Sequence, residues 1–565
     1  MPRHDYAFSY SCLFVFIRGF NLVRPSLAFL IPVLALLIFS QFIVAPTHAA
    51  VSLRRMSFFL GFDSSTQSLK ALIIDAAAGK IAAAATVNFG KDLPQYHSPE
   101  GVLANADPAV KHADPLLWLA ALDLALRRLA DSGAPLAAVR GIGGSGQQHG
   151  SVYLNNTAAA ALAALDPARS LADQLAGIFS RKTSPIWMDS STGTEVREIG
   201  TALGKRLQDD TGSPAIERFT GPQIRRFLKT DPLGFARTAR IHLVSSFMAS
   251  VLVGKDAPID RGDGAGMNLL NLRAGRWDKA AADATAPGLE RLLPPVATAA
   301  GTLAGKLHPY FAKYGLPAGI PVALWTGDNP ASLIGMGAHR PGKAVVSLGT
   351  SDTVFAAFEK FHTDPDGFGH VFGNPAGGNM SLACFKNGSL ARDRIRAETG
   401  ADWTFFDETA FAQTQPGNGG RLALPWFEPE ITPSGRPVGL RANFDFAAAA
   451  PAVRIRAAVE GQVLSRALHS AWVGRFDTLR VTGGASRSKG ILQTLADVFQ
   501  AKVETIAVTD SAALGAALIA AHDTGGFAYD TLAAAFCPTG ETILPRPETA
   551  PIYAALLPEI RKLEG

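Results

Sequence analysis

The sequence is poor in cysteine, since its 565 residues include only Cys12, Cys384 and Cys537. These cysteines have no metal-ligand spacing, and although one disulfide is arithmetically possible, they imply no disulfide framework. We therefore expect a reducing compartment, which favours a cytoplasmic location. The sequence also lacks a P-loop, because no Gly-Lys-Ser or Gly-Lys-Thr ends its glycine-rich stretch at residues 141–150 (GIGGSGQQHG).

Charged residues are sparse as well, at 18% of the chain with a formal net charge of +5. Lysine and arginine are scattered and form no basic stripe with interleaved aromatic residues, so we expect no nucleic-acid partner. Hydrophobic residues make up 47% of the chain, which is enough for a large buried core. A chain of this length exceeds one ordinary core, which predicts two large domains.

The first 55 residues differ in kind from the rest. Arg18 and Arg24 precede an uncharged, mostly apolar run at residues 27–45. This pattern is typical of a signal peptide or a marginal membrane anchor. We favour an over-extended gene start, because Met56 stands directly before the first predicted strand. A membrane partner is expected only if residues 1–55 are retained.

One stretch carries the clearest signal of function. Residues 59–75 (FLGFDSSTQSLKALIID) hold two apolar runs separated by Asp63 and three small hydroxyl residues. This pattern predicts two strands joined by a tight turn. Such a turn offers N–H groups and hydroxyls to phosphate oxygens, and its carboxylate can hold a hydrated Mg²⁺. Residues 343–358 (KAVVSLGTSDTVFAAF) repeat the pattern, so we expect two related domains that face one nucleotide.

From Met56 onward, apolar strands alternate with Ala/Leu-rich helices, which is typical of α/β architecture. Residues 115–131 predict a helix, with Pro115 at its start and Gly133 just after its end. Residues 139–146 predict a short strand. The clearest boundary is the Pro/Gly-rich segment 308–321. We place the two domains at residues 56–312 and 313–565.

Asp328 is the strongest candidate for an acid or a base. It lies within ALWTGDNPASLIGMG, where a strand is predicted to end before Thr326 and Gly327 form a turn and a helix begins. Asp328 would then lie at a helix N-terminus, where free backbone donors favour its ionised form. An isolated aspartate in this position is more often only a helix cap. The neighbouring motifs must therefore decide whether Asp328 is a cap alone or also a base.

Three other motifs supply polar or open backbone groups. Residues 147–149 (QQH) offer donors and acceptors suited to sugar hydroxyls, although a lone histidine such as His149 is more often structural. Arg218 could clamp a hydroxyl or a phosphate, or simply pair with Glu217. Gly484 and the glycine before it follow a predicted strand and permit close backbone approach to a flat ligand such as adenine.

Many segments in a fixed order give the sequence a family resemblance. They read GFDSSTQSLKA, SGQQHGSVY, WMDSST, IERFTG, LVSSF, GMNLL, TGDNPASL, VSLGTSDT, CFKNGSL, and TGGAS with LADVF. In these segments the chain, over about residues 56–521, resembles the FGGY family of carbohydrate kinases. The resemblance implies a duplicated actin-like, ribonuclease-H-like fold with two domains around a central cleft. It also implies transfer of the γ-phosphoryl group of MgATP to a hydroxyl of a sugar or polyol.

The resemblance implies three groups of site residues. Asp328 is expected to be the base that accepts the proton of the sugar hydroxyl. The expected sugar contacts are His149, Arg218, Asp328 and Asn329. The expected contacts to ATP and Mg²⁺ are Asp63, Thr66, Gly349, Thr350, Trp403, Gly484, Ala485 and Ser488, with Asp63 as the metal ligand.

Within the family, the segments QQHG and TGDNP favour D-xylulose as the acceptor. We therefore expect ATP-dependent formation of D-xylulose 5-phosphate in pentose catabolism. Ribulose, glycerol and gluconate are alternative acceptors, and a non-catalytic actin-like protein that binds ATP or a sugar is an alternative of another class. The expected partners are the sugar and ATP, and a monomer and a homodimer are both compatible with the sequence.

Overall fold

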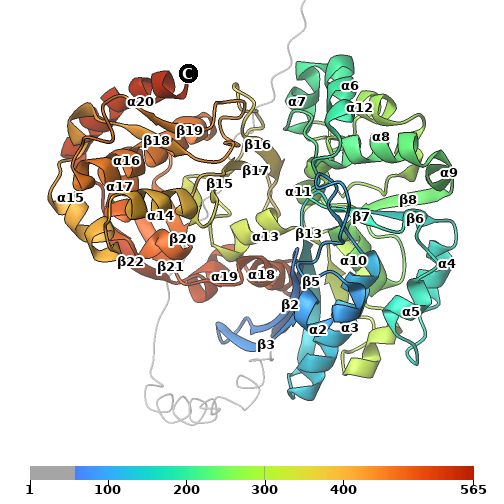
Figure 1. The fold of residues 1–565 in the computed structure, drawn as a ribbon. Coiled ribbons are helices and arrows are strands. Elements are labelled where there is room, and N and C mark those ends of the chain that lie inside the picture. Colours follow the sequence, from blue (N-terminus) through green and yellow to red (C-terminus); the bar gives the residue numbers. More distant parts are fainter. Residues whose placement is uncertain (1–56, 298) are drawn as a thin grey trace, which may run out of the picture. The chain divides into compact units, whose positions relative to one another are not determined.

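Two large sheets organise the computed structural model, which describes residues 57–297 and 299–565 (Figure 1). The first sheet has the order β11–β12–β5–β1–β2–β3, with β13 paired to β5, and the second has the order β16–β17–β15–β14–β20–β21–β22. The first sheet consists of β1 (Phe58–Ser64), β2 (Ser68–Asp75), β3 (Lys80–Asn88), β5 (Val139–Gly146), β11 (Leu303–Lys306), β12 (Pro321–Ala323) and β13 (Thr326–Gly327). The second consists of β14 (Lys343–Leu348), β15 (Asp352–Phe358), β16 (His370–Gly373), β17 (Asn379–Phe385), β20 (Thr478–Thr482), β21 (Lys502–Ile506) and β22 (Thr539–Ile543).

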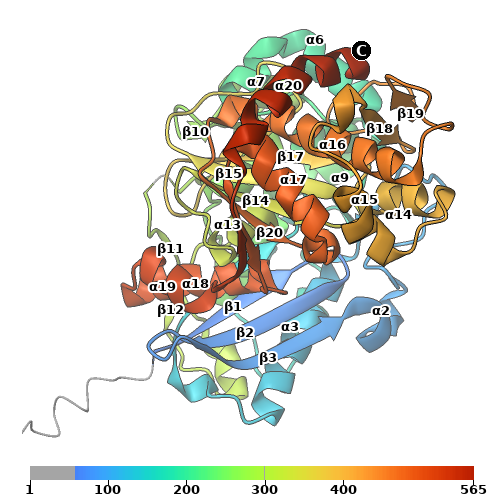
Figure 2. The same ribbon diagram turned by 90° about the vertical axis from the view of Figure 1, so that its left-hand side faces the viewer.

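The two sheets share one pairing pattern around their first strands. Strand β1 is antiparallel to β2 and parallel to β5, and β14 is likewise antiparallel to β15 and parallel to β20. Each meander continues with a third antiparallel strand, β3 in the first sheet and β17 in the second. Figure 2 shows β1, β2 and β3 side by side. The predicted hairpins and the duplicated α/β fold are therefore confirmed.

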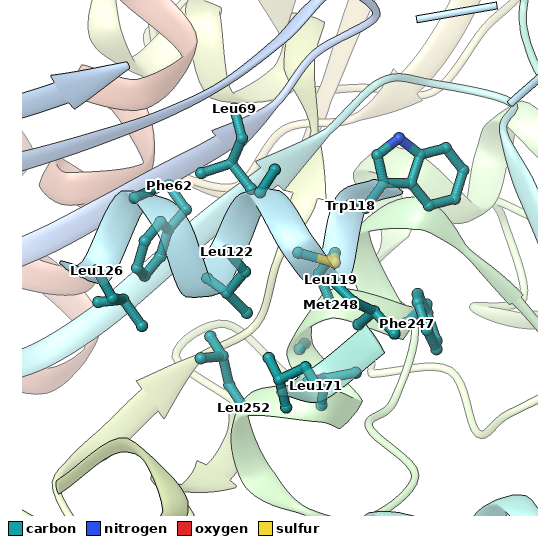
Figure 3. Close-up of a cluster of buried hydrophobic side chains, with 14 of the residues drawn as sticks. Phe62, Leu69, Trp118, Leu119, Leu122, Leu126, Leu171, Phe247, Met248 and Leu252 are labelled. Carbon is teal, nitrogen blue, oxygen red and sulfur yellow. The ribbon is translucent and has the colours of Figure 1, made fainter. Parts of the chain in front are cut away.

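The first sheet packs against α3 (Pro115–Asp131), which has the bounds that the sequence predicts. The Asp114 carboxylate caps the helix by accepting from the N–H of Leu116. Leu122 and Leu126 of α3 are fully buried in the cluster of Figure 3, which also includes Phe62 of β1. Each buried leucine contributes about 2 kcal/mol to the free energy of unfolding. This packing gives β1 a rigid base.

A helix of small residues, α18 (Ser511–Gly525), packs on β1, on β5 and on α13 (Asp328–Gly335). A Cβ atom on Gly61 of β1 would lie 2.3 Å from the Ala517 nitrogen of α18. On the other contact of α18, a Cβ atom on Gly515 would lie 1.8 Å from the Ala331 carbonyl oxygen of α13. Glycine at both contacts therefore lets α18 hold α13, which begins at Asp328, close to the first sheet.

The segment before Asp328 corrects one detail of the sequence analysis. Thr326 and Gly327 do not form a turn, because they pair as β13 with Ser145 and Gly146 of β5. Both β12 and β13 follow residue 312 and yet belong to the first sheet. The domain ranges 56–312 and 313–565 stay a prediction.

Two expectations concern residues that are not described. The hydrophobic segment of residues 1–55 lies outside the described residues, and so does Cys12. Of the helices in residues 57–297 and 299–565, none has the length and apolar character needed to cross a bilayer. Cys384 and Cys537 are free thiols.

Candidate active site

Asp63 occupies the end of β1, opposite Lys70 of β2 and Ser145 of β5. Its two carboxylate oxygens accept hydrogen bonds from the hydroxyls of Ser65 and Ser145 at 2.5 and 2.8 Å. Burial raises the pKa of Asp63 above its ordinary value, although the hydroxyls and Lys70 oppose this shift. Asp63 forms no ion pair with any described residue, and a buried carboxylate of this kind favours a bound cation.

Asp328 is the first residue of α13, as the sequence predicts, and Gly327 is the N-cap. The strand before it pairs with β5 at Ser145, the residue whose hydroxyl also binds Asp63. Desolvation and then the negative charge of Asp63 raise the pKa of Asp328 to about 7, so these two effects outweigh the backbone N–H donors that the sequence analysis expected to favour the ionised form. A group with this pKa is well matched to accepting a proton at neutral pH.

A chain of side-chain amides lies beside Asp328. The Asn329 amide Nδ2 donates to Asp328 Oδ1 at 3.0 Å and to Gln148 Oε1 at 2.8 Å. The Nε2 groups of Gln147 and Gln148 are buried and have no hydrogen-bond partner in the described part of the chain, and the same holds for the Ser64 hydroxyl. These donors and the oxygen of Ser64 are therefore available to a ligand.

His149 follows this pair of glutamines in a left-handed backbone conformation, with φ of 67°. Its Nδ1–H donates to the Gly266 carbonyl oxygen at 2.9 Å, and its ring stacks on Phe219 with 4.3 Å between centroids. Burial, and secondly the charge of Arg218, lower the pKa of His149 to about 3. The imidazole is therefore neutral, and its Nε2 is free to accept a hydrogen bond from a ligand hydroxyl.

Arg218 is half-buried next to His149, and it does not form the ion pair with Glu217 that the sequence left open. Its guanidinium instead donates to Nε2 of His370 at 3.1 Å and lies over the ring of Phe219. His370 belongs to β16 of the second sheet. The residues expected to contact the sugar therefore lie together, and one strand of the second sheet supports them.

The second hairpin lies next to the glycine turn that follows β20. Gly349 and Thr350 form the turn between β14 and β15, and β14 is parallel to β20. Gly483 has φ of 95°, and a Cβ atom there would lie 2.4 Å from the Leu348 carbonyl oxygen, so only glycine allows the two turns to approach this closely. A Cβ atom on Gly484 would meet nothing within 4 Å, which leaves this surface open to a ligand.

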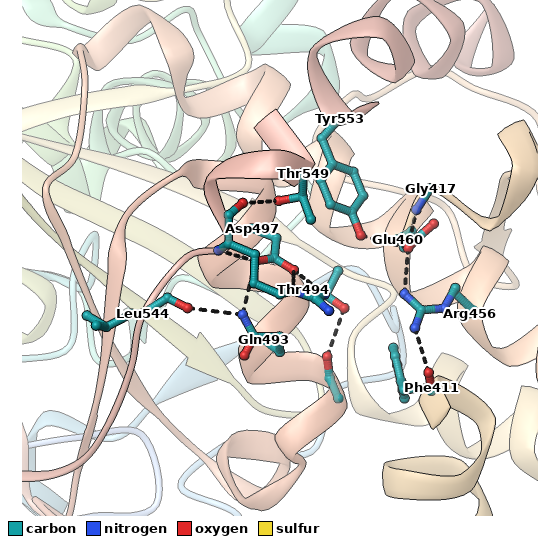
Figure 4. Close-up of polar contacts among 12 residues, drawn as sticks. Phe411, Gly417, Arg456, Glu460, Gln493, Thr494, Asp497, Leu544, Thr549 and Tyr553 are labelled. Atoms are coloured by element: carbon teal, nitrogen blue, oxygen red, sulfur yellow. Dashed lines mark hydrogen bonds and ion pairs between the residues drawn. The ribbon is translucent and has the colours of Figure 1, made fainter. Parts of the chain in front are cut away.

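Ala485 and Ser488 continue from this turn into α17 (Lys489–Phe499). The Ser488 hydroxyl caps α17 by accepting from the N–H of Ile491 at 3.4 Å. Figure 4 shows one link between α17 and the C-terminal segment, where the Gln493 amide donates to the Leu544 carbonyl oxygen at 3.1 Å. Nearby in the sequence, Arg546 forms an ion pair with the buried Asp497 of α17 at 2.5 Å. Contacts at both ends of α17 therefore fix its position, and with it the position of the glycine turn that precedes it.

Trp403 is an expected nucleotide contact that lies just before the short helix Phe405–Thr409, which packs against α17. Its side chain is 50% exposed, and its ring contacts Phe406 and the guanidinium of Arg396. No hydrogen bond or ion pair between described residues joins Trp403 to Gly484. Likewise, none joins the residues around Asp63 to those around Gly349. The role of Trp403 stays a prediction.

The structure adds three residues that the sequence analysis missed. Trp187 is 45% exposed, and its indole N–H donates to the Thr66 hydroxyl at 2.8 Å. It could have been found, since it lies in the family segment WMDSST. Asp352 could likewise have been found, since it lies in the family segment VSLGTSDT, whereas His370 gave no local signal, because its partner Arg218 is far away in sequence.

Comparisons with known proteins agree with this geometry. Residues 183–335 match the N-terminal domain of the FGGY family of carbohydrate kinases, and residues 344–524 match its C-terminal domain. The chain belongs to the FGGY family of carbohydrate kinases. The resemblance stated from the sequence is therefore confirmed.

Relatives within the FGGY family resemble nearly the whole chain. The chain is 43% identical over 499 residues to xylulose kinase 2 of Arabidopsis thaliana, covering 84% of this chain and 88% of the relative. It is 40% identical over 523 residues to the xylulose kinase of Rattus norvegicus, and the match covers 89% of this chain and 96% of the relative. A crystal structure of a xylulose kinase from Rhodospirillum rubrum superposes with a TM-score of 0.75 at 21% identity, covering 89% of this chain and 97% of that one, which supports the fold.

The arrangement around Asp63 also suits the divalent cation that FGGY kinases are expected to use. Mg²⁺ is usually held by one or two carboxylates together with waters and substrate phosphates. Asp63 supplies one unpaired carboxylate, and the partnerless Ser64 hydroxyl lies next to it in sequence. The described residues contain no group of three or more His, Cys, Asp or Glu side chains that could form a complete metal cage. The residues present therefore fit a cation that is shared with a nucleotide.

Proposed function

We propose that this protein catalyses the ATP-dependent phosphorylation of D-xylulose to D-xylulose 5-phosphate. The observation that carries the proposal is Asp328, a carboxylate with a pKa of about 7 next to neutral sugar-type donors and acceptors. The names of the relatives from Arabidopsis thaliana and Rattus norvegicus support D-xylulose as the acceptor.

In the proposed reaction, Asp328 accepts the proton of the attacking sugar hydroxyl while the new O–P bond forms and ADP leaves. A positioned base contributes on the order of 10² to 10⁴ in rate. Most of the remaining acceleration comes from positioning and from stabilising charge on the phosphoryl oxygens. His149, Arg218 and Asn329 would orient the sugar so that this hydroxyl faces Asp328.

The two hairpins would hold the triphosphate. Asp63 would bind Mg²⁺, which when bound would neutralise charge on the β- and γ-phosphates. The turns at Thr66 and at Gly349 and Thr350 would donate N–H groups and hydroxyls to phosphate oxygens. The expected contacts to the adenosine part are Trp403, Gly484, Ala485 and Ser488.

The cellular part of the proposal is a cytoplasmic enzyme. The free thiols of Cys384 and Cys537 and the requirement for ATP support this location. A monomer or a homodimer with no nucleic-acid partner completes the proposal.

A coupled assay of ADP release tests the proposed substrate. The purified chain is supplied with MgATP and, separately, with D-xylulose, D-ribulose, glycerol and gluconate. We expect the highest kcat/KM with D-xylulose, and mass spectrometry should identify the product as a pentose phosphate. A higher kcat/KM with another acceptor would reassign the substrate, and ATP binding with no sugar-dependent ADP release would contradict the kinase proposal.

A further inference from the structure

His370 is a buried residue that the proposed mechanism does not use. It is 2% exposed and makes two side-chain hydrogen bonds. Its Nε2 accepts from the Arg218 guanidinium at 3.1 Å, and its Nδ1 lies 3.1 Å from the Ser213 hydroxyl. Because an arginine can only donate, Nε2 carries no proton and Nδ1–H donates to Ser213. The bond network therefore determines the tautomer of this imidazole.

The chemistry of this acceptor matters for Arg218. The bond to His370 is the only one that joins the Arg218 guanidinium to a described side chain or backbone group, so its other N–H groups stay free for a ligand. A carboxylate in place of His370 would neutralise the guanidinium, whereas a neutral imidazole orients it and leaves its full charge. A charged donor of this kind forms stronger hydrogen bonds to sugar hydroxyls than a neutral one.

The aromatic neighbours of His370 complete the support. Its ring lies 5.5 Å from Phe219 and 6.2 Å from Phe372, and the His149 ring stacks on the same Phe219. Arg218 itself lies over Phe219. His370 therefore supports two of the four expected sugar contacts, Arg218 through a hydrogen bond and His149 through the shared ring of Phe219.

The strand order connects His370 to the second phosphate hairpin. His370 of β16 pairs with Leu382 of β17, and β17 pairs along β15, which begins at Asp352 just after the hairpin turn. Two strand pairings therefore lie between His370 and this hairpin.

We propose that His370 is a positioning residue that orients Arg218 and thereby sets the affinity for the sugar. The inference rests on the proposed sugar kinase function. It predicts that loss of the imidazole acceptor weakens sugar binding, with little effect on the chemical step or on ATP.

Three variants separate the acceptor from packing. His370→Phe keeps a ring against Phe219 and Phe372 but removes both nitrogens, and His370→Gln keeps an acceptor near the position of Nε2. His362→Phe is the matched control: His362 also lies in the second half of the chain, and its nitrogens bond the carbonyl oxygens of Lys360 and Trp472, not Arg218.

For His370→Phe we expect the sugar KM to rise about tenfold with kcat within about threefold, the size expected for a lost hydrogen bond to a charged group. The KM for ATP should stay within about twofold, and calorimetry of sugar binding without ATP should show the same tenfold loss. His370→Gln and His362→Phe should remain within about threefold of the wild-type sugar KM. In an Arg218→Met background, His370→Phe should change the sugar KM by less than about twofold, because its partner is gone.

Each outcome decides the inference. Equal losses in His370→Phe and His370→Gln would show a packing role, and an unchanged KM in His370→Phe would show no role; either result overturns the proposal. If His370→Phe does not fold, Ser213→Ala replaces it, with an expected rise of about threefold in sugar KM; no rise would overturn the proposal. A wild-type enzyme that prefers another acceptor changes only the sugar used in these assays, whereas one that phosphorylates no sugar contradicts the proposed function itself.

Discussion

The two hairpins β1–β2 and β14–β15, which we propose hold the triphosphate, each carry a buried aspartate, and the environments of these two residues are opposite. Asp63 of the first hairpin is 5% exposed, and among the described residues its hydrogen-bond donors are the neutral hydroxyls of Ser65 and Ser145. Asp352 of the second hairpin is fully buried and is bound by the guanidinium groups of Arg392 and Arg466 at 2.7–3.1 Å. One carboxylate is left available for a cation, and the other is already neutralised by the protein.

The pKa shifts follow from this difference. Burial raises the pKa of Asp63, and its neighbours do not fully compensate. Burial alone would also raise the pKa of Asp352, but the two arginines hold it below its ordinary value. A duplicated fold has thus placed one carboxylate in a role that suits chemistry and the other in a role that suits structure. Asp328, which likewise has no ion pair with a described residue, belongs with Asp63.

The largest expected effect is on Asp328. Asp328→Asn removes the base but keeps an acceptor for the Asn329 backbone N–H, which the carboxylate binds at 2.8 Å. We expect kcat to fall on the order of 10² to 10⁴ while the Kd values for sugar and ATP, measured by calorimetry, change little. Turnover close to that of the wild type would contradict the assignment of Asp328 as the base.

The second prediction compares the two hairpin aspartates directly by urea unfolding at pH 7. Asp352→Asn leaves two buried arginines without their partner and should lower the free energy of unfolding by about 3–5 kcal/mol. Asp63→Asn removes an unpaired buried charge and should leave the free energy of unfolding unchanged or raise it. A large loss of stability in Asp63→Asn would show that both hairpins use their aspartates structurally.

The same comparison has a pH dependence of opposite sign. The folded pKa of Asp352 is lowered, so its stabilisation is present above the ordinary value and is lost as the pH falls through the folded pKa. The gap between the wild type and Asp352→Asn should therefore shrink in acid. The folded pKa of Asp63 is raised, so its cost appears as the pH rises from the ordinary value through the folded pKa.

The sequence predicts the local features of this comparison but not its long-range partners. The apolar runs and turn residues were sufficient to predict both hairpins. Pro115 and Gly133 were sufficient to bound α3, and the helix start at Asp328 was also predicted. The arginine partner Arg466 lies 114 residues from Asp352, and Arg218 lies 152 residues from His370. Such contacts depend on tertiary packing, which the periodicity of strands and helices does not reveal.

The mistaken turn at Thr326 and Gly327 has the same cause. Glycine after a short apolar run favours a turn in local terms. Pairing with Ser145 and Gly146 of β5, about 180 residues earlier, makes this segment a strand instead. Tertiary pairing thus overrides a local preference at the point where Asp328 is positioned.

The third prediction concerns the interaction between the two carboxylates that have no ion pair. With the pKa of Asp328 at about 7, kcat/KM for the sugar should decrease as the pH falls below about 7, because the base becomes protonated. The charge of Asp63 contributes to this raised pKa. In Asp63→Asn, the acidic limb of the profile of kcat/KM against pH should therefore move to lower pH. Asp352→Asn, if it folds, should not move the limb. A limb that stays in place in Asp63→Asn would mean that the two groups do not interact.

The smallest expected effect tests how the first hairpin turn is held. The buried Asp189 anchors the Trp187 segment by accepting from the Gln223 amide at 2.7 Å and from the Lys111 backbone N–H at 2.8 Å. Trp187 in turn donates to the Thr66 hydroxyl, whereas arginines buttress the second hairpin from its buried side.

We expect Trp187→Phe, which keeps a ring but loses the donor, to raise the KM for ATP by no more than about fivefold, the value of one neutral hydrogen bond. Thr66→Val removes the same bond and also a hydroxyl proposed to bind phosphate, so it should raise the KM for ATP at least as much, and the double variant should be no worse than Thr66→Val alone. Met188→Leu is the control, since this exposed neighbour has no hydrogen bond to Thr66. Additive losses in the double variant would mean that Thr66 and Trp187 contact ATP independently, and that the first hairpin turn needs no support from this segment.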